Sequence, residues 1–331
     1  MKAEYALHAL DFSFSFSTSN FLIMYSIFRC SIPPGSNVYF VNTDPAVIID
    51  TGHPDSVEQT LDILKRHVPL DNVGYILCTH THGDHIGGAS AFQKAFGAKT
   101  MIFMPEVNSK LTDKHRREIR LIHEMPEIDS YLEADMQITV GDDFIRVIHT
   151  PGHADDHCCF YFTKRKYLFT GDLLANDDIG FLNINKHYTT ALDEIKHSIE
   201  QCATLETTRV FTGHGDTYRM APWNKIMRKL SLFERNPALL VPHTLISPFL
   251  FHLWAAGRPV PVEESENYIV DHAYLFDGFL ENCTPDLILH EFRRLATLLT
   301  FRGIVNVADN CFTHAFTSKP TWQWYKRKMK E

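Results

Sequence analysis

Short blocks of hydrophobic residues alternate with polar turns and amphipathic stretches over roughly the first 220 residues of the chain. Apolar blocks of about four to eight residues are typical of strands, and longer stretches with a helical period are typical of helices. The predicted strands are Phe21–Phe28, Val38–Val41, Val47–Asp50, Val73–Thr79, Thr100–Met104, Phe144–His149, Cys158–Thr163, Tyr167–Thr170 and Arg209–Thr212. The predicted helices are Ser56–His67, Gly88–Phe96 and Thr190–Thr204. Several neighbouring strands are joined by turns of hairpin length, which favours mixed sheets with helices outside.

Two further stretches of this part have patterns of their own. Phe12–Phe16 alternates phenylalanine with serine, which predicts a strand with one buried face. Lys110–Glu133 is rich in charged residues and is expected to form a helical insertion that is broken near Pro126.

The pattern changes beyond Arg219, where prolines become frequent and a strong helix follows near the C-terminus. Thr284 is the expected N-cap of a helix over Pro285–Thr300, and Gly303 lies just past its end. Its predicted buried stripe consists of Ile288, Phe292, Leu295 and Leu299, widened by Leu287 and Leu298. Two short apolar runs after the helix predict a hairpin, so this region has a winged-helix-like pattern.

The length of 331 residues corresponds to about two domains of ordinary size. We expect a catalytic domain over residues 1–220 and a mainly helical C-terminal region over residues 221–331. The net charge of −8 disfavours a protein that grips a nucleic-acid backbone over a broad face. The seven cysteines contain no Cys-x-x-Cys pair, and no apolar run reaches the length of about 20 residues that a membrane span needs. A reduced, cytoplasmic protein without a membrane anchor is the expectation.

The 19 histidines direct attention to metal ligands, and the segment Tyr75–Gly88 carries the strongest pattern. A hydrophobic strand runs directly into His80 and His82, whose imidazoles project to the same side of an extended backbone. Two nitrogens on one side suit a first metal ion. Asp84 and His85 follow where the chain turns, so they can address a second metal beside the first.

Three later segments repeat the order of strand, glycine and ligand. His153 adds a third nitrogen for the first metal, Asp172 adds a carboxylate able to bridge two cations, and His214 follows the last predicted strand of this part. The predicted ligand set is therefore five histidines and two aspartates. His149 is expected to be structural, and Asp155 and Asp156 to cap the turn into the next strand.

Over roughly residues 20–220 these motifs resemble the metallo-β-lactamase superfamily, because four separate motifs occur in the same order. The resemblance implies the four-layer αββα sandwich of that superfamily. It also implies that His80, His82 and His153 bind one metal, that Asp84, His85 and His214 bind the other, and that Asp172 bridges them. His157 is similar in position to a second histidine of glyoxalase II, and a supporting role beside the site is the expectation for it.

Imidazole and carboxylate ligands suit zinc, with iron and manganese as alternatives, so the expected cofactors are two divalent metal ions. Two cations that share a water molecule lower its pKa and create a hydroxide nucleophile, with Asp84 and Asp172 as the catalytic carboxylates. The reaction class indicated is metal-assisted hydrolysis.

The substrate is less determined by the pattern. The first hypothesis is a small thioester or related acyl substrate, by resemblance to glyoxalase II and thioesterases of this fold. The alternatives are a phosphodiesterase of the lactamase-beta-like endoribonuclease type, supported by the basic run Lys326–Lys330, and a sulfur dioxygenase with a single iron. The C-terminal region is expected to supply substrate specificity or a homodimer contact.

Overall fold

The computed structural model describes residues 6–10, 27–32, 35–104, 126–175, 178–183, 186, 188–236, 239–240, 245, 249–250, 252–253, 256, 258–271 and 284–314. The chain divides into two compact units, and both are assembled from separate segments. The first unit consists of Met1–His149, Asp156–Gly171 and Glu206–Met220. The second consists of Thr150–Asp155, Asp172–Leu205 and Ala221–Glu331. The simpler division at residue 220 remains a prediction.

The first unit contains a sheet of seven strands in the order in which they occur in the chain. The strands are β1 (Ala6–Leu10), β2 (Ile27–Ser31), β3 (Asn37–Val41), β4 (Ala46–Ile49), β5 (Val73–Cys78), β6 (Lys99–Phe103) and β7 (Ser130–Leu132). Strands β1 to β4 pair antiparallel, whereas β4 to β7 pair parallel. The sheet is therefore mixed, as the hairpin-length turns predicted.

A second sheet of the same unit has the strand order β14-β11-β10-β9-β8. Its members are β8 (Gln137–Val140), β9 (Asp143–His149), β10 (Cys158–Phe162), β11 (Tyr167–Phe169) and β14 (Arg209–Phe211). Cys158 pairs with His149 across β10 and β9, so these two residues close the base of the loop between the strands. β14 runs parallel to β11, which brings the chain segments after both strands to the same edge of the sheet.

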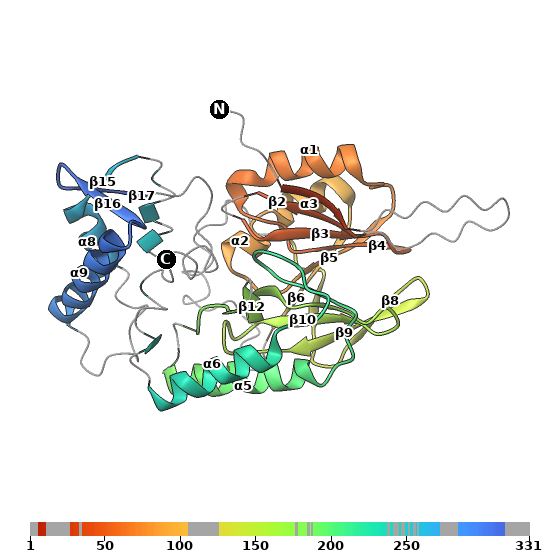
Figure 1. Ribbon diagram of the computed structural model, residues 1–331. Helices are drawn as coiled ribbons and strands as arrows, with labels where there is room; N and C mark the ends of the chain where they lie inside the picture. The colour runs from red at the N-terminus through yellow and green to blue at the C-terminus, as the bar shows by residue number, and fades with distance from the viewer. Residues whose placement is uncertain are drawn as a thin grey trace. The chain divides into compact units, whose positions relative to one another are not determined.

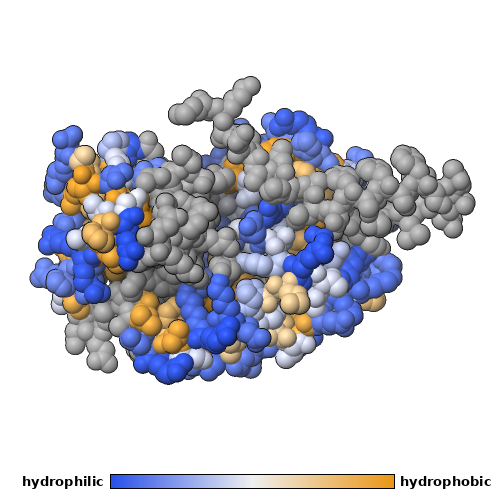
Figure 2. Space-filling view, in the orientation of Figure 1, coloured by the Kyte–Doolittle hydropathy of each residue, from blue (hydrophilic) through white to orange (hydrophobic). Residues whose placement is uncertain are grey.

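The two sheets bury apolar side chains against each other, with Tyr39, Leu77, Phe160 and Phe211 in the shared core. The opposite face of the first sheet is covered by α1 (Val57–His67) and α3 (Ala89–Phe96), whose Leu64 and Phe92 are fully buried. Figure 1 shows both helices over the sheet that contains β2 to β5. Figure 2 shows hydrophilic residues over much of the outward face, with apolar residues in small groups.

The second unit holds four further helices and two small sheets among its described residues. α5 (Tyr188–Ala203) packs on α6 (Trp223–Arg235), and β12 (Leu174–Ala175) pairs with β13 (Asp178–Ile179). Farther along the chain, α8 (Val262–Asp271) and α9 (Pro285–Phe301) pack beside a three-stranded sheet. Its strands are β15 (Val260–Pro261), β16 (Val305–Ala308) and β17 (Cys311–His314).

α9 has the predicted cap, because the hydroxyl of Thr284 accepts a hydrogen bond from the backbone N–H of Leu287. The four residues of its predicted stripe are buried. The proposed widening at Leu298 is wrong, since this side chain is 39% exposed and faces away from the core.

Two predictions fall partly outside the described residues. Of the strand predicted at Phe21–Phe28, Ile27 and Phe28 are described and both belong to β2, whereas residues 11–26 are not described. The alternating run Phe12–Phe16 lies in that range. In the predicted helical insertion, residues 105–125 are not described, and Ser130–Leu132 forms β7 instead of helix because it adds to the edge of the first sheet.

Candidate metal centre

The histidine-rich loop begins where β5 ends inside the core of the first unit. Cys78, Thr79 and His80 are fully buried, so the strand delivers His80 to a defined place rather than to solvent. The backbone of His82 is still extended, with φ −64° and ψ 143°. Nε2 of His80 and Nδ1 of His82 lie 2.8 Å apart. The two imidazoles thus present nitrogen atoms to a common point, as their spacing of two residues predicted.

Asp50, at the end of β4, organises this loop. Its carboxylate accepts hydrogen bonds from the backbone N–H of Thr79 at 2.8 Å, from the Thr79 hydroxyl and from Nδ1 of His85 at 2.8 Å. The Thr79 hydroxyl also lies 3.1 Å from Nδ1 of His80. Asp50 therefore directs Nε2 of His85, and through Thr79 Nε2 of His80, toward the other candidate ligands.

Sequence analysis missed the role of Asp50. The signal was available, because Asp50 ends a buried strand beside a Thr-Gly pair, and Thr-Gly pairs also stand next to Asp172 and His214 at the ends of their strands. Its φ of 56° is rare for a residue other than glycine and indicates a backbone held by its surroundings.

Asp84, His85 and His214 form a compact group within the first unit. One ligand atom from each lies within 4.8 Å of the others. Nε2 of His214 is 3.0 Å from Oδ2 of Asp84, and Nε2 of His85 is 3.9 Å from the same oxygen. Ligands of a tetrahedral zinc ion at about 2.0–2.2 Å from the metal are separated by similar distances. The donor set fits a divalent cation.

The loop that carries His214 is fixed by residues of β3. The backbone N–H of Asn37 donates to the carbonyl of Gly213 at 2.7 Å. The hydroxyl of Tyr39 and Nδ2 of Asn37 both donate to the carbonyl of Thr212, at 2.8 and 2.9 Å. Because these bonds connect β3 to a loop more than 170 residues farther along the chain, sequence analysis gave no sign of them.

His153 and Asp172 belong to the second unit, where they contact each other. Nε2 of His153 lies 3.7 Å from Oδ2 of Asp172, and Nδ1 of His153 donates to the carbonyl of Phe181 at 2.7 Å. His153 sits in the loop whose base is closed by the His149–Cys158 pair. Asp172 directly follows Gly171, whose carbonyl accepts a hydrogen bond from Gly213.

Among the residues that the structure describes, the groups of side chains that could hold a metal ion draw on seven residues alone. They are His80, His82, Asp84, His85, His153, Asp172 and His214. These are also the seven residues that the sequence motifs single out. Imidazole nitrogens with carboxylate oxygens are ligands that zinc, iron and manganese accept.

Four other polar residues follow or lie near these ligands in the chain, and they differ in what they contact. His157 is fully buried, and its ring centroid lies 5.2 Å from that of His80. Asp156 does more than cap a turn: its carboxylate accepts from the backbone N–H of Thr81 at 2.9 Å, between the two histidines of the loop. Asp155 accepts from Nδ2 of Asn183 instead. His149 stacks on Phe103, which agrees with a structural role.

The cysteines of the core do not supply further ligands to these groups. The six that are described are in the thiol form and not in disulfides. Burial, with smaller contributions from Asp50 and Asp156, raises the pKa of Cys78 well above its ordinary value. Burial also raises the pKa of Cys158. Both sulfurs therefore stay protonated and behave as apolar core groups.

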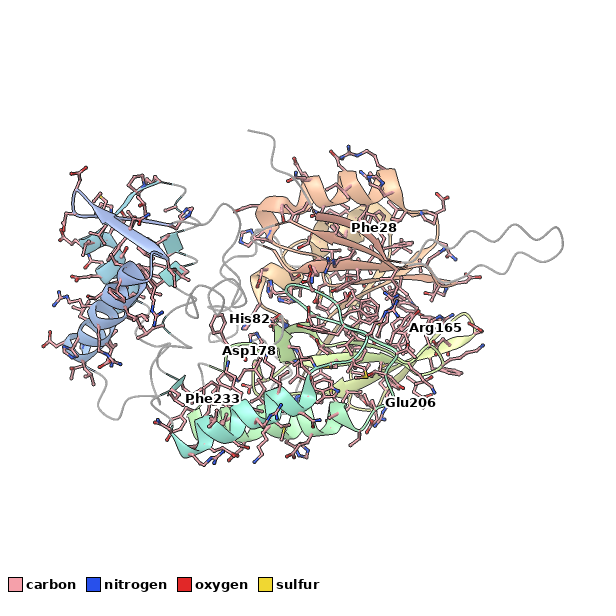
Figure 3. All side chains as sticks on the ribbon, in the orientation of Figure 1. Phe28, His82, Arg165, Asp178, Glu206 and Phe233 are labelled. Carbon is pink, nitrogen blue, oxygen red and sulfur yellow. The ribbon has the colours of Figure 1, made fainter. Side chains whose placement is uncertain are left out.

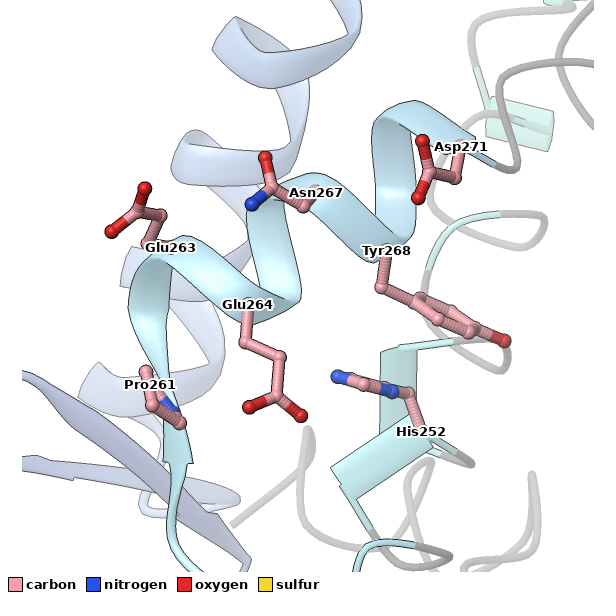
Figure 4. Close-up of a pocket in the computed structure, with 7 residues that line it drawn as sticks. All are labelled: His252, Pro261, Glu263, Glu264, Asn267, Tyr268 and Asp271. Carbon is pink, nitrogen blue, oxygen red and sulfur yellow. The ribbon is translucent and has the colours of Figure 1, made fainter.

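A separate surface pocket of about 460 Å³ lies between α8 and the residues around His252. It is lined by His252, Pro261, Glu263, Glu264, Asn267, Tyr268 and Asp271. The rings of His252 and Tyr268 are stacked with their centroids 4.1 Å apart. Figure 4 shows the Glu264 carboxylate on the same side as the His252 ring. This pocket shares no residue with the seven candidate ligands.

Residues 32–214 match the family model described as the metallo-beta-lactamase superfamily. The chain belongs to this superfamily. The match begins just after β2 and ends at His214, so it includes all seven candidate ligands of this metallo-β-lactamase-fold protein.

Relatives among characterised and named proteins agree with this membership. A lactamase-like protein of Pestalotiopsis microspora is 32% identical over 264 residues, which cover 78% of this chain and 72% of that protein. A beta-lactamase-like protein 2 homolog of Caenorhabditis elegans is 28% identical over 188 residues. That match spans 55% of this chain and 56% of the relative, little more than half its length.

Two further relatives have names that state an activity. A hydroxyacylglutathione hydrolase of Pelagibacter ubique is 30% identical over 171 residues, covering 51% of this chain and 61% of that enzyme. An atrochrysone carboxyl ACP thioesterase of Cryptosporiopsis is 25% identical over 187 residues, covering 55% and 49%.

Among solved structures, a metallo-beta-lactamase family protein from Thermus thermophilus matches with a TM-score of 0.51. The match covers 88% of this chain and 98% of that protein at 18% identity, so it shows a shared fold and nothing further. The predicted fold class is confirmed. In the described part of the chain, none of the helices has both the length and the apolar character to span a membrane.

Proposed function

We propose that this protein is a metal-dependent hydrolase with a dinuclear site. His80, His82 and His153 hold the first metal, Asp84, His85 and His214 hold the second, and Asp172 bridges them. The observation that carries the proposal is the Asp84–His85–His214 group, which has compact donor geometry and a histidine oriented by a buried carboxylate. Zinc is the expected metal, with iron and manganese as alternatives.

The chain connectivity supports the inclusion of His153 and Asp172. The loop between β9 and β10 holds His153 only four residues beyond the paired His149 and five before Cys158. Asp172 is three residues beyond the end of β11. Orientation supports it as well, because the hydrogen bond from Nδ1 of His153 to Phe181 fixes the tautomer in which Nε2 is the ligand atom.

The proposed site residues have different roles in the reaction. When bound, two divalent cations lower the pKa of a water molecule and polarise the scissile carbonyl. Asp84 orients the attacking water by accepting its hydrogen bond, and Asp172 acts with it as the second catalytic carboxylate. Asp50 and Asp156 hold the histidine loop, so that its ligands do not have to reorganise during the reaction.

The substrate class that we propose is a small thioester or related acyl compound. Its support is the names of two relatives, the hydroxyacylglutathione hydrolase and the ACP thioesterase. The net charge of −8 points in the same direction, because it opposes the approach of polyanions. A reduced, cytoplasmic location suits the thiol form of the described cysteines.

A phosphodiesterase is the second candidate. One observation favours it: α9 is followed by the β16–β17 hairpin in a three-stranded sheet, as in winged-helix modules that bind nucleic acids.

The deciding experiment compares two substrate panels on protein whose metal content has been quantified. One panel contains acyl thioesters, and the other contains RNA and small phosphodiesters. We expect thioester turnover that is lost on chelation and restored by zinc. Phosphodiester cleavage with no thioester turnover would replace the first proposal by the second. Turnover that survives complete metal removal would refute both.

A further inference from the structure

Phe181 is an exposed aromatic residue in an otherwise buried segment. Its side chain is 37% exposed, whereas those of Ile179 and Leu182 on either side are 2% and 4% exposed. The segment follows the β12–β13 hairpin in the second unit. Single exposed apolar side chains are ordinary on protein surfaces, so the interest of Phe181 lies in its neighbours.

The backbone at this point touches two of the proposed metal ligands. The carbonyl of Phe181 accepts the 2.7 Å hydrogen bond from Nδ1 of His153. Gly180 packs closely against both Asp172 and His153. A Cβ at this position would lie 2.0 Å from the Asp172 carbonyl oxygen and 3.2 Å from Nδ1 of His153. The phenyl ring of Phe181 is therefore one residue away from a point that contacts both ligands.

The segment is held at both ends. Beyond Phe181, the backbone N–H of Asn183 donates to the carbonyl of Gly152 at 2.7 Å. Before it, the buried carboxylate of Asp178 is paired with the ammonium group of Lys229 on α6. Figure 3 labels Asp178 on the hairpin and Phe233 on α6, over whose ring the Lys229 ammonium group lies at 5.1 Å. A ring presented on so fixed a backbone is preorganised for recognition.

From this placement we propose that Phe181 determines substrate specificity by packing against an apolar group attached to the reacting carbonyl. The inference rests on the proposed function, because it takes His153 and Asp172 as ligands of the metal site. It narrows the substrate class to acyl compounds with an aliphatic or aromatic acyl group rather than a small polar one.

The first test measures kcat/KM for acetyl and phenylacetyl thioesters of N-acetylcysteamine. In the Phe181→Ala variant, we expect the value for phenylacetyl to fall tenfold or more and the value for acetyl to fall no more than threefold. Phe144→Ala is the matched control, because Phe144 is 45% exposed on β9 and is expected to leave both values unchanged. Equal losses on both thioesters, or no loss on either, would overturn the proposal.

A second test does not depend on turnover. The carboxylate product of the reaction keeps the acyl group and can bind zinc through oxygen, so phenylacetate and acetate probe the surroundings of the metal in zinc-loaded protein. By titration calorimetry, Phe181→Ala is expected to weaken the binding of phenylacetate at least tenfold and that of acetate by less than threefold. An unchanged ratio would refute the role of Phe181.

The two tests separate the two proposals. A wild-type protein that hydrolyses neither thioester, but whose preference for phenylacetate depends on Phe181, would contradict the acyl-hydrolase function and leave the contact intact. Thioester hydrolysis with no dependence on Phe181 in either test would support the acyl-hydrolase function and contradict the contact between Phe181 and the acyl group.

Discussion

The carboxylate of Asp50 accepts a 2.8 Å hydrogen bond from Nδ1 of His85. It also accepts a hydrogen bond from the Thr79 hydroxyl, which in turn contacts Nδ1 of His80, so Asp50 orients that imidazole as well. One buried group directly after β4 thus orients two imidazoles that follow β5. Because the tautomer of a histidine determines which nitrogen can bind a metal, Asp50 would act on both of the proposed metal positions at once.

Asp50→Asn is expected to weaken metal binding by about 10- to 100-fold while the fold is retained. The amide is similar in size to the carboxylate, but its NH2 group cannot accept the proton of His85, and its charge is lost. The measurement is a competition titration with a zinc chelator. Asp55→Asn is the control, because the Asp55 side chain is 67% exposed. Equal zinc affinity in the wild type and in Asp50→Asn would contradict the positioning role.

Asp172→Ala is expected to remove bound metal and activity together, because the carboxylate proposed to bridge the two metal ions is lost. The circular dichroism spectrum is expected to stay unchanged. The measurement is the number of metal ions per chain by elemental analysis, followed by thioester turnover. A variant that keeps two metal ions and full turnover would show that Asp172 does not bridge.

Tyr39→Phe is expected to lower the free energy of unfolding by about 1 kcal/mol, because a buried hydrogen bond to the Thr212 carbonyl is removed. This loss of stability is expected at the low end of the range of about 0.5–1.5 kcal/mol that is typical of one hydrogen bond, since Asn37 still donates to the same oxygen. Urea denaturation measures it. Tyr131→Phe, at a residue that is 49% exposed, serves as the control and is expected to change little.

The same variant should change the pH dependence of stability. Burial raises the pKa of Tyr39 well above its ordinary value. Above about pH 10 the unfolded chain loses the phenolic proton while the folded chain keeps it, so the free energy of unfolding of the wild type falls as the pH rises. Tyr39→Phe lacks this contribution. The stability difference between the two proteins is therefore expected to narrow between about pH 9 and pH 11, and a constant difference would contradict the raised pKa.

Lys229→Met is expected to destabilise the protein by about 3 kcal/mol, because the fully buried carboxylate of Asp178 loses its cation. The double variant Asp178→Asn with Lys229→Met is expected to recover most of this loss, since no buried charge remains. Thermal and urea denaturation of the single and double variants measure the difference. A double variant no more stable than Lys229→Met would show that the ion pair is not the cause.

The sequence predicted most of the sheet strands and the seven candidate ligands because both depend on local pattern. A buried strand that ends in His-x-His-x-Asp-His is visible without knowledge of the fold. The capped helix after Thr284 is equally local.

What sequence analysis missed depends on contacts between distant segments. Asp50 is one aspartate among many until β4 is paired with β5 and its carboxylate meets Thr79. The bonds from Asn37 and Tyr39 to the His214 loop have no counterpart in the local pattern. β7 was mistaken for helix because a three-residue edge strand is specified by its partner β6 rather than by its own residues.

Positions 180 and 181 differ sharply in what they tolerate. Any side chain at Gly180 would collide with the Asp172 carbonyl, so this position is closed to variation. The side chain of the next residue, Phe181, is 37% exposed, and the hydrogen bond from His153 is made to its backbone carbonyl, a group that every residue has. Evolution or mutagenesis can therefore change the residue at position 181, and with it the substrate preference, while the proposed metal ligands His153 and Asp172 stay the same.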